Sequence, residues 1–269
     1  TEALVLLTIS HRTEYHFAAP VYYALQQIRL TPRDSKQQKV LSWSIEIAAG
    51  TREAQSAAHY GNMTDLISTT PDSKSLEISV IGQVETSDTA GVYGKVRSAV
   101  PLWLYKQTTE LTEPGEGIQA LAKSCADAND KLSALHDLSS SIQTHVAYKT
   151  GATGPETTAE KAFAGKQGVC QDHAHIFIAA ARAAGLPARY VSGYLLMDDR
   201  VEQEATHAWA EAYVGDLGWV GCDVSNGHSP DERYVRVASG LDYRDAAPVS
   251  GLRQGNGDES LIVSLQVQQ

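Results

Sequence analysis

The sequence predicts an α+β protein in which an N-terminal antiparallel β domain precedes a mixed helical and β core. Up to about residue 110, short segments rich in Val, Ile and aromatic residues alternate with Pro, Gly, Asp and Ser clusters, a pattern typical of strands and turns. Beyond that point apolar residues recur at spacings of three and four, which is typical of amphipathic helices. We therefore expect a β domain at residues 1–110 and a core at residues 111–269.

Strands of the first domain are expected at residues 3–10, 21–32, 41–50 and 75–86. In the third of these, four apolar residues alternate with serine and glutamate and are expected to face the core: Leu41, Trp43, Ile45 and Ile47. The apolar run near the N-terminus is five residues long and follows no basic segment. We interpret it as a first strand and not as a signal peptide.

Helices of the core are expected at residues 112–127, at 130–148, within 157–168, and at 169–187. Thr157 or Thr158 is placed to cap the third helix, because a threonine hydroxyl accepts hydrogen bonds from free N–H groups at a helix start. Gly185, with Pro187 behind it, ends the fourth helix. The strands expected to complete the core are residues 188–196, 206–214 and 218–224.

The composition argues against several classes of protein. With 22 Lys+Arg against 32 Asp+Glu, the net charge of −10 argues against a general binder of nucleic acids or anionic membranes. No run approaches the roughly 18 apolar residues of a membrane-spanning helix. Three cysteines in 269 residues cannot form a disulfide framework, and the odd number leaves one thiol free. We therefore expect a reducing, cytoplasmic compartment.

Cys170 lies where a glycine-containing loop meets the start of the helix at 169–187. Free N–H groups and the dipole at a helix N-terminus favour a thiolate, the nucleophilic form of cysteine, and they can also receive an oxyanion. Asp172, in the first turn, would oppose that thiolate unless its carboxylate points elsewhere. Cys125, within a helix, and Cys222, within an apolar strand, are expected to be buried, space-filling residues.

His207 and Asp223 are the expected partners of Cys170. Strand alternation places His207 on the same face as Trp209, whose ring would shield the imidazole from water. If the strands on either side of the GDLG turn form a hairpin, Asp223 ends beside the start of the partner strand, where His207 lies. A carboxylate there would orient the imidazole as a base.

A metal-dependent hydrolase is a third interpretation of the same region. Cys170 and His173 would share a helix face, and His207 would supply a third ligand. Cys-x2-His-x-His is not a usual zinc spacing, however, and His175 points nearly opposite His173. We therefore expect no metal site.

Three segments, in this order, resemble the cysteine, histidine and aspartate motifs of the transglutaminase-like superfamily: GVCQDHAHIFIAAARAAGLPARYVSGYL, THAWAEAYV and GWVGCDVSNG. Other stretches are similar to the bacterial branch with an N-terminal β domain, namely TEYHFAAPV, QQIRLTPR, YGNM and LDYRDAAPVSG. The resemblance therefore covers nearly the whole chain. It departs from the commoner pattern after Asp223, where Val-Ser-Asn replaces Pro-Thr-Asn, and at Thr206, where Ser is frequent.

This resemblance implies a transglutaminase- or papain-like core with the Cys170 helix packed on an antiparallel sheet. It implies Cys170 as nucleophile, His207 as general base and acid, and Asp223 as the carboxylate that orients the histidine. The implied chemistry is acyl transfer from an amide or peptide through a thioester, without a cofactor. We expect a peptidase or amidase acting on a peptide or protein. A cross-linking transglutaminase and a non-catalytic binding protein with a vestigial triad are the alternatives.

Substrate contacts are expected from five further residues: Gln167 as a second oxyanion donor, Trp209, Tyr243, Arg244 and Asp245. Two loop-like segments, 197–205 and 225–251, are expected to form the walls of the site. The first contains Asp198, Asp199, Glu202 and Glu204, and this acidity favours a substrate with an amine-bearing group.

Overall fold

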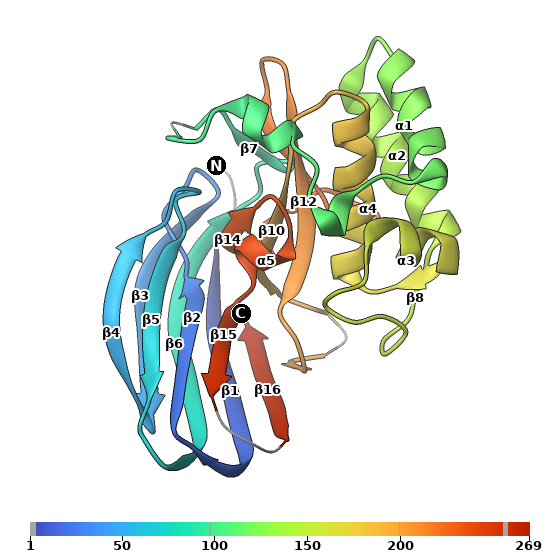
Figure 1. Cartoon of the computed structure of the whole chain (residues 1–269). Coiled ribbons are helices and arrows are strands. Elements are labelled where there is room, and N and C mark those ends of the chain that lie inside the picture. Colours follow the sequence, from blue (N-terminus) through green and yellow to red (C-terminus); the bar gives the residue numbers. More distant parts are fainter. Residues whose placement is uncertain (1–3, 97, 199, 255–257) are drawn as a thin grey trace.

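The structure, a computed structural model, describes residues 4–96, 98–198, 200–254 and 258–269. It confirms the α+β class: a sandwich of two β-sheets lies beside a third sheet that is covered on one face by helices (Figure 1). The described residues contain no helix that is long and apolar enough to cross a membrane.

The sandwich is formed by β1 (Leu4–Val21), β2 (Tyr23–Thr31), β3 (Gln38–Ala48), β4 (Gly50–Ala57), β5 (Met63–Thr69), β6 (Ser73–Ser87), β11 (Glu202–Gln203), β15 (Val249–Gln254) and β16 (Glu259–Gln268). One sheet has the order β11-β16-β1-β6-β3 and the other β15-β2-β5-β4, with antiparallel pairing. Apolar side chains from β1, β2, β5 and β6 form the buried core between the sheets. Alternation along β1 supplies inward-facing residues such as Tyr15 and Phe17.

The inward face predicted for β3 is correct at Trp43, Ile45 and Ile47 and wrong at Leu41. The three correct residues pack, partly buried, against the sandwich core. The pairing of β3 with β6 shifts register between Val40 and Ser42, so Val40 packs inward and Leu41 is 49% exposed. The extra residue at such a bulge reverses the alternation of side chains, which a strict period of two cannot anticipate.

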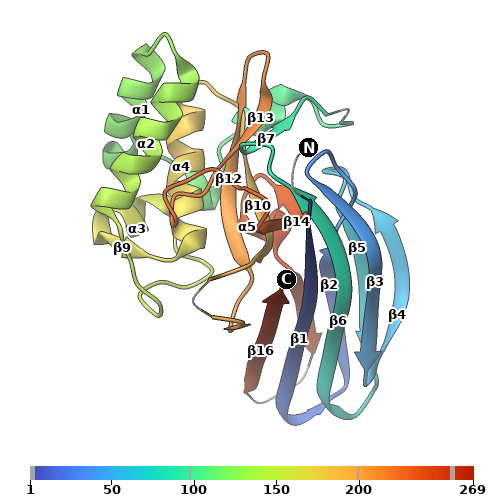
Figure 2. The same cartoon turned by 180° about the vertical axis from the view of Figure 1, so that it is seen from behind.

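The last strands of the chain return to the sandwich. β16 pairs with β1, as both views show, and β15 pairs with β2 (Figures 1 and 2). Conversely, β7 (Val92–Gly94) belongs to the N-terminal half of the chain but pairs with β13 of the third sheet. The N-terminal half of the chain therefore contributes a strand to the third sheet, and the C-terminal half contributes strands to the sandwich. The domain boundary between residues 110 and 111 stays a prediction.

The core sheet has the order β14-β10-β12-β13-β7. Its other strands are β10 (Ala188–Leu195), β12 (His207–Val214), β13 (Gly218–Cys222) and β14 (Tyr234–Gly240). The helical elements are η1 (Leu102–Lys106), η2 (Glu110–Thr112), α1 (Glu116–Asp127), α2 (Lys131–His145), α3 (Ala159–Gly165), α4 (Cys170–Ala183) and α5 (Tyr243–Ala246). A short parallel pair joins β8 (Ala147–Tyr148) to β9 (Gln167–Gly168).

Helix α4 packs on β12 through small side chains. Ala208, Ala210 and Ala212 alternate along β12 and lie in one buried cluster with α1, α2 and α4. The opposite face of β12 carries Trp209, which is buried against β10 and β14. The alternation predicted for this strand is confirmed, and the small alanines allow the helix to approach the sheet closely.

The boundaries of two predicted segments are wrong in a way that matters for the site. The helix expected at 130–148 ends at His145, and residues 147–148 form β8 instead. The segment 225–251, expected to be a loop, contains β14 and α5. In both cases pairing with a distant segment, β9 or β10, determines the conformation.

Of the two threonines expected to cap the third helix, Thr158 is the cap, and its hydroxyl accepts a hydrogen bond from the Lys161 N–H.

Candidate active site

Cys170 is the first residue of α4, as the sequence predicts. Asp172 points back to the residue before the helix: its Oδ2 accepts from the Val169 N–H at 2.8 Å and from the Thr153 hydroxyl at 2.6 Å. A Cβ on Gly168 would lie 2.7 Å from the Asp172 Cβ, so the chain needs a glycine there for the carboxylate to fold back. Burial raises the pKa of Asp172 despite these hydrogen bonds. The carboxylate therefore holds the backbone just before the helix.

His207, at the start of β12, and Asp223, just after β13, are in direct contact. The predicted hairpin is confirmed, with Ala210 opposite Cys222 and Val214 opposite Gly218. His207 Nε2 lies 2.6 Å from Asp223 Oδ2, and both side chains are buried. Burial acts against protonation of His207, but the charge and hydrogen bond of Asp223, together with Cys170, raise the pKa of the imidazole to about 10.

Asp223 is held as a carboxylate by a full set of donors. Oδ2 also accepts from the Tyr234 hydroxyl at 2.7 Å and from Asn226 Nδ2 at 2.7 Å, while Oδ1 accepts from the backbone N–H groups of Ser225 and Asn226. Burial alone would raise the pKa of Asp223, but His207 and these donors lower it to about 2. The Val-Ser-Asn stretch after the aspartate thus supplies several of the hydrogen bonds that fix this side chain.

Two titratable side chains, His207 and Tyr148, lie close enough to Cys170 for this residue to raise the pKa of each. Because His207 Nε2 is engaged by Asp223, Nδ1 is the ring nitrogen left for the sulfur. Tyr148 comes from β8, which the pairing Tyr148–Gly168 holds beside the loop that leads into Cys170. Burial and the neighbouring Cys170 raise the pKa of Tyr148 to about 12, so its hydroxyl remains a donor at neutral pH.

His173 connects the two loops that carry these partners. Its Nε2 donates to the Val146 carbonyl at 3.0 Å, and its Nδ1 lies 2.9 Å from the Ser225 hydroxyl. Val146 lies two residues before Tyr148, and Ser225 lies two residues after Asp223. Burial lowers the pKa of His173, so the ring is neutral, with Nδ1 accepting from the serine. Both ring nitrogens are therefore engaged in positioning the surrounding chain.

This arrangement differs from the metal site weighed for Cys170, His173 and His207. The three side chains do not form a common cluster, because His173 faces Val146 and Ser225. Among the residues that the structure describes, no group of three or more His, Cys, Asp or Glu side chains is placed to hold a metal ion.

A cleft of about 460 Å³ opens beside His207. The described residues that line it are Tyr148, Leu195, Leu196, Met197, Asp198, Arg200, His207, Ser225, Asn226, His228 and Arg233. One wall is apolar, whereas the loop side mixes charges, with Asp198 3.6 Å from Arg233. The predicted wall 197–205 thus contributes its first residues to the cleft. Glu202 pairs with β16 and Glu204 lines a separate cavity, while Asp199 lies outside the described residues.

The five expected substrate contacts have different locations. Gln167 lies in β9 beside the cysteine loop, and Trp209 is buried with its ring stacked near His207, their centroids 6.2 Å apart. Tyr243 donates its backbone N–H to His175, Arg244 pairs with Glu110 and Glu156 at the surface, and Asp245 accepts from the Leu241 N–H. None of the five is among the described residues that line the cleft. Their contact with substrate stays a prediction.

Three residues of the site are not predicted from the sequence: Tyr148, Asn226 and Tyr234. The sequence pattern predicts a helix end at Tyr148 and a loop at Tyr234, but both residues reach the site through strand pairing between distant segments. Asn226 carried a local signal, since an asparagine three residues after a carboxylate in a tight turn can hydrogen bond back to it.

Comparison with known families gives two matches along the chain. Residues 119–224, which include Cys170, His207 and Asp223, match the transglutaminase-like superfamily. Residues 7–85, within the sandwich, match the bacterial transglutaminase-like N-terminal region.

Relatives extend the likeness to almost the full length. An uncharacterised protein of Mycobacterium tuberculosis is 32% identical, over 96% of this chain and 91% of that protein, and one of Mycobacterium leprae is 27% identical over 97% and 98%. A protein-glutamine gamma-glutamyltransferase of Pseudomonas aeruginosa is 32% identical over 39% of this chain and 17% of its own length. The crystal structure of a candidate cysteine protease from Cytophaga hutchinsonii has a TM-score of 0.79 at 22% identity, covering 99% of this chain and 91% of that one, and therefore has the same fold.

Proposed function

Because the chain belongs to the transglutaminase-like superfamily, with the bacterial N-terminal region of that family, we propose that it is a cysteine-dependent enzyme that hydrolyses amide or peptide bonds. The observation that carries the proposal is the buried His207–Asp223 pair, with Nε2 2.6 Å from Oδ2, beside Cys170 at the first residue of α4. A nucleophile, a base within hydrogen-bond reach and an orienting carboxylate are the parts that covalent catalysis requires.

In the proposed reaction the Cys170 sulfur attacks the carbonyl carbon of the amide. His207, protonated through its pairing with Asp223, then donates its Nδ1 proton to the leaving nitrogen as the C–N bond breaks. The acyl group remains on Cys170 as a thioester. Neutral His207 next takes a proton from water, whose oxygen attacks the thioester and releases the acid and the thiolate.

Two donors are available for the oxyanion that forms during each attack. The Cys170 N–H lies in the first turn of α4, where N–H groups have no partner within the helix. We propose that the Tyr148 hydroxyl, which lies near Cys170, is the second donor. Gln167, which lies in β9 and pairs with Ala147, stays a predicted alternative donor.

Hydrolysis is favoured over transfer to an amine because water reaches the site. Tyr148, which lies near Cys170, is 54% exposed, and it lines the adjoining cleft together with Met197, Asp198 and Arg200. The match to the Pseudomonas glutamyltransferase supports cross-linking as the second candidate. Both reactions would use the same thioester, so they differ only in the acceptor.

The test is release of ammonia or amine from a glutamine-containing peptide library, followed by mass spectrometry with and without an added primary amine. The proposal expects products hydrolysed at an amide bond, with no amine incorporated, and no product with Cys170→Ala. Incorporation of the amine would replace hydrolysis by transglutamination. Equal product formation by Cys170→Ala, or no acylation of Cys170 by any peptide, would overturn the enzymatic proposal and favour the non-catalytic binding protein.

A further inference from the structure

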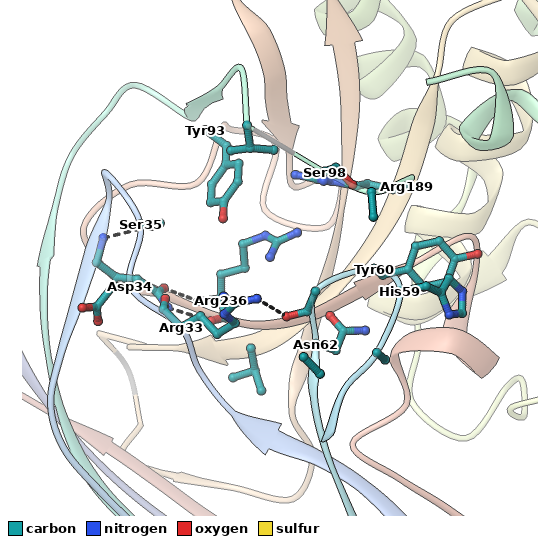
Figure 3. A pocket seen from close by; sticks show the side chains of 17 residues that line it. Arg33, Asp34, Ser35, His59, Tyr60, Asn62, Tyr93, Ser98, Arg189 and Arg236 are labelled. Carbon is teal, nitrogen blue, oxygen red and sulfur yellow. Dashed lines mark hydrogen bonds between the residues drawn. The ribbon is translucent and has the colours of Figure 1, made fainter. Parts of the chain in front are cut away.

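A second cavity, of about 540 Å³, lies at the seam between the sandwich and the core sheet (Figure 3). Among the described residues it shares no lining residue with the active-site cleft. Its walls are the β2–β3 loop, the β4–β5 loop and the segment around β7, and its floor is formed by Arg189 and Arg236 of β10 and β14. Its volume falls within the roughly 300–1,000 Å³ range of small-molecule sites.

The floor of this cavity carries more positive than negative charge. Arg189 donates from Nε to Glu211 at 2.6 Å, and Arg236 donates from Nε to the other oxygen of Glu211 at 3.1 Å. Two guanidinium groups thus share one carboxylate, which leaves one positive charge in excess. The side chains are buried or nearly so, with 4%, 14% and 3% of Arg189, Arg236 and Glu211 exposed. An uncompensated charge at such a depth is costly in free energy unless a counter-charge joins it.

The two arginines are engaged to different extents. Arg189 also pairs with Glu211 through Nη2, and its guanidinium lies over the Trp219 ring, 3.9 Å from the centroid. Among the described residues, Arg236 contacts a carboxylate through Nε alone, while its guanidinium lies 4.6 Å from the centroid of the Tyr93 ring. Its two terminal nitrogens are therefore donors available to the cavity, held in place by the carboxylate and the ring.

Arg182, at the end of α4, shows how a purely structural arginine is satisfied in this chain. It is buried, and its nitrogens donate to the carbonyls of Tyr105, Ala188 and Leu241 and to the Thr112 hydroxyl. All three of its nitrogens have protein acceptors. Among the described residues, Arg236 has no such set of acceptors, so its surroundings differ from those of the structural Arg182.

The rim adds a third arginine and further polar groups. Arg33 is exposed and donates from Nη1 to the Gly61 carbonyl at 2.7 Å, which holds its guanidinium over the β4–β5 loop. Ser35, His59, Tyr60 and Ser98 also line the cavity, as the view in Figure 3 shows. The acidic residue of the lining is Asp34, whose Oδ1 accepts from the Val40 N–H. In a chain of net charge −10, this is a concentration of positive charge.

We propose that this cavity, here named the seam pocket, binds a small organic anion through a carboxylate or phosphate group. The anion would accept hydrogen bonds from the terminal nitrogens of Arg236 and balance the excess charge of the Arg189–Glu211–Arg236 cluster, with Arg33 closing over it. Planar guanidinium groups match the geometry of both oxyanions. Tyr60 and Tyr93 provide flat surfaces for the rest of the ligand.

The test is calorimetric titration of the full chain with inorganic phosphate and, separately, with succinate, with sodium chloride keeping the ionic strength constant. The proposal expects saturable binding of one equivalent of at least one of these probes, and the stronger probe identifies the oxyanion. Cys170→Ala should bind equally well, so the result is independent of the proposed enzymatic function. Absence of saturable binding by both probes would overturn the proposal.

Three variants locate the bound probe. Arg236→Met leaves a balanced Arg189–Glu211 pair and should abolish binding, while Arg33→Gln, at the exposed rim, should weaken it about tenfold. Arg12→Gln is the matched control, because Arg12 is an exposed arginine paired with Glu77 on the sandwich. Should Arg236→Met fail to fold, the probe affinities of Arg33→Gln and Arg12→Gln are compared to decide whether the probe binds in the seam pocket. Equal affinities for these two variants and the wild type would place the probe elsewhere and contradict the proposal.

Discussion

Replacing Asp223 by Asn should convert His207 from an imidazolium to a neutral ring at pH 7. The substitution keeps the shape of the side chain and one oxygen for its donors, but it removes the charge that lies 2.6 Å from His207 Nε2. In the wild type the pKa of His207 is about 10 against an ordinary 6.5. At 1.36 kcal/mol for each pKa unit, the imidazolium is favoured by an amount on the order of 5 kcal/mol. Without the charge, burial dominates and should bring the pKa below 6.5.

The sign of this effect also determines how stability depends on pH. Because the pKa of His207 is raised, its contribution is fully present below about pH 6.5 and is lost as the pH rises through about 10. The pKa of Asp223 is lowered to about 2, so its contribution is present above 3.8 and is lost as the pH falls through about 2. Asp223→Asn should therefore remove several kcal/mol of unfolding free energy at pH 7.

The assay is ¹⁵N NMR of histidine-labelled protein between about pH 5 and 9, with His207→Gln used to identify the resonances among nine histidines. The wild-type ring should stay protonated throughout, and the Asp223→Asn ring should become neutral within this range or below it. Asp216→Asn is the control, since Asp216 is an exposed carboxylate paired with Lys95. A His207 resonance that titrates alike in Asp223→Asn and wild type would refute the electrostatic reasoning.

Three further predictions concern the thiol and its surroundings. Tyr148→Phe should lower kcat about 100-fold with little change in KM, as expected on loss of one oxyanion donor, and steady-state kinetics showing only a KM effect would remove Tyr148 from that role. Iodoacetamide should alkylate Cys170 first, because Cys125 and Cys222 are only 2% and 3% exposed. Burial also raises the pKa of both of these thiols, that of Cys222 to about 12. Peptide mapping that finds equal alkylation rates at all three cysteines would contradict this prediction. Gly168→Ala should lower the unfolding free energy by about 1–3 kcal/mol in urea denaturation, because the new methyl group collides with the Asp172 side chain, and an unchanged midpoint would show that Asp172 moves aside freely.

Local patterns in the sequence predicted the parts of the site that are close together along the chain. The Gly-containing loop before an apolar helix placed Cys170 at the first residue of α4. Alternation and a tight turn predicted the β12–β13 hairpin, and the hairpin brings His207 to Asp223. These features depend on short-range periodicity and turn geometry, which a single sequence contains.

Features that depend on pairing between distant segments could not be predicted. Tyr148 meets Cys170 because β8 pairs in parallel with β9, and Tyr234 reaches Asp223 because β14 pairs with β10. The return of β15 and β16 to the sandwich and the bulge at Leu41 likewise follow from register with other strands. No local pattern distinguishes these arrangements from a helix end, a loop or a regular strand.

Acylation of Cys170 by an activated ester, followed by intact-protein and peptide mass spectrometry after rapid quenching, tests the central claim most directly. The claim predicts one equivalent of a hydroxylamine-sensitive acyl group on Cys170, which forms quickly in the wild type and in Cys125→Ala and then decays as water attacks. It predicts that the group forms at least about 100-fold more slowly in His207→Gln. An acyl group found on Cys125 or Cys222, or equal rates in the wild type and His207→Gln, would contradict a nucleophile activated by the Cys170–His207–Asp223 chain.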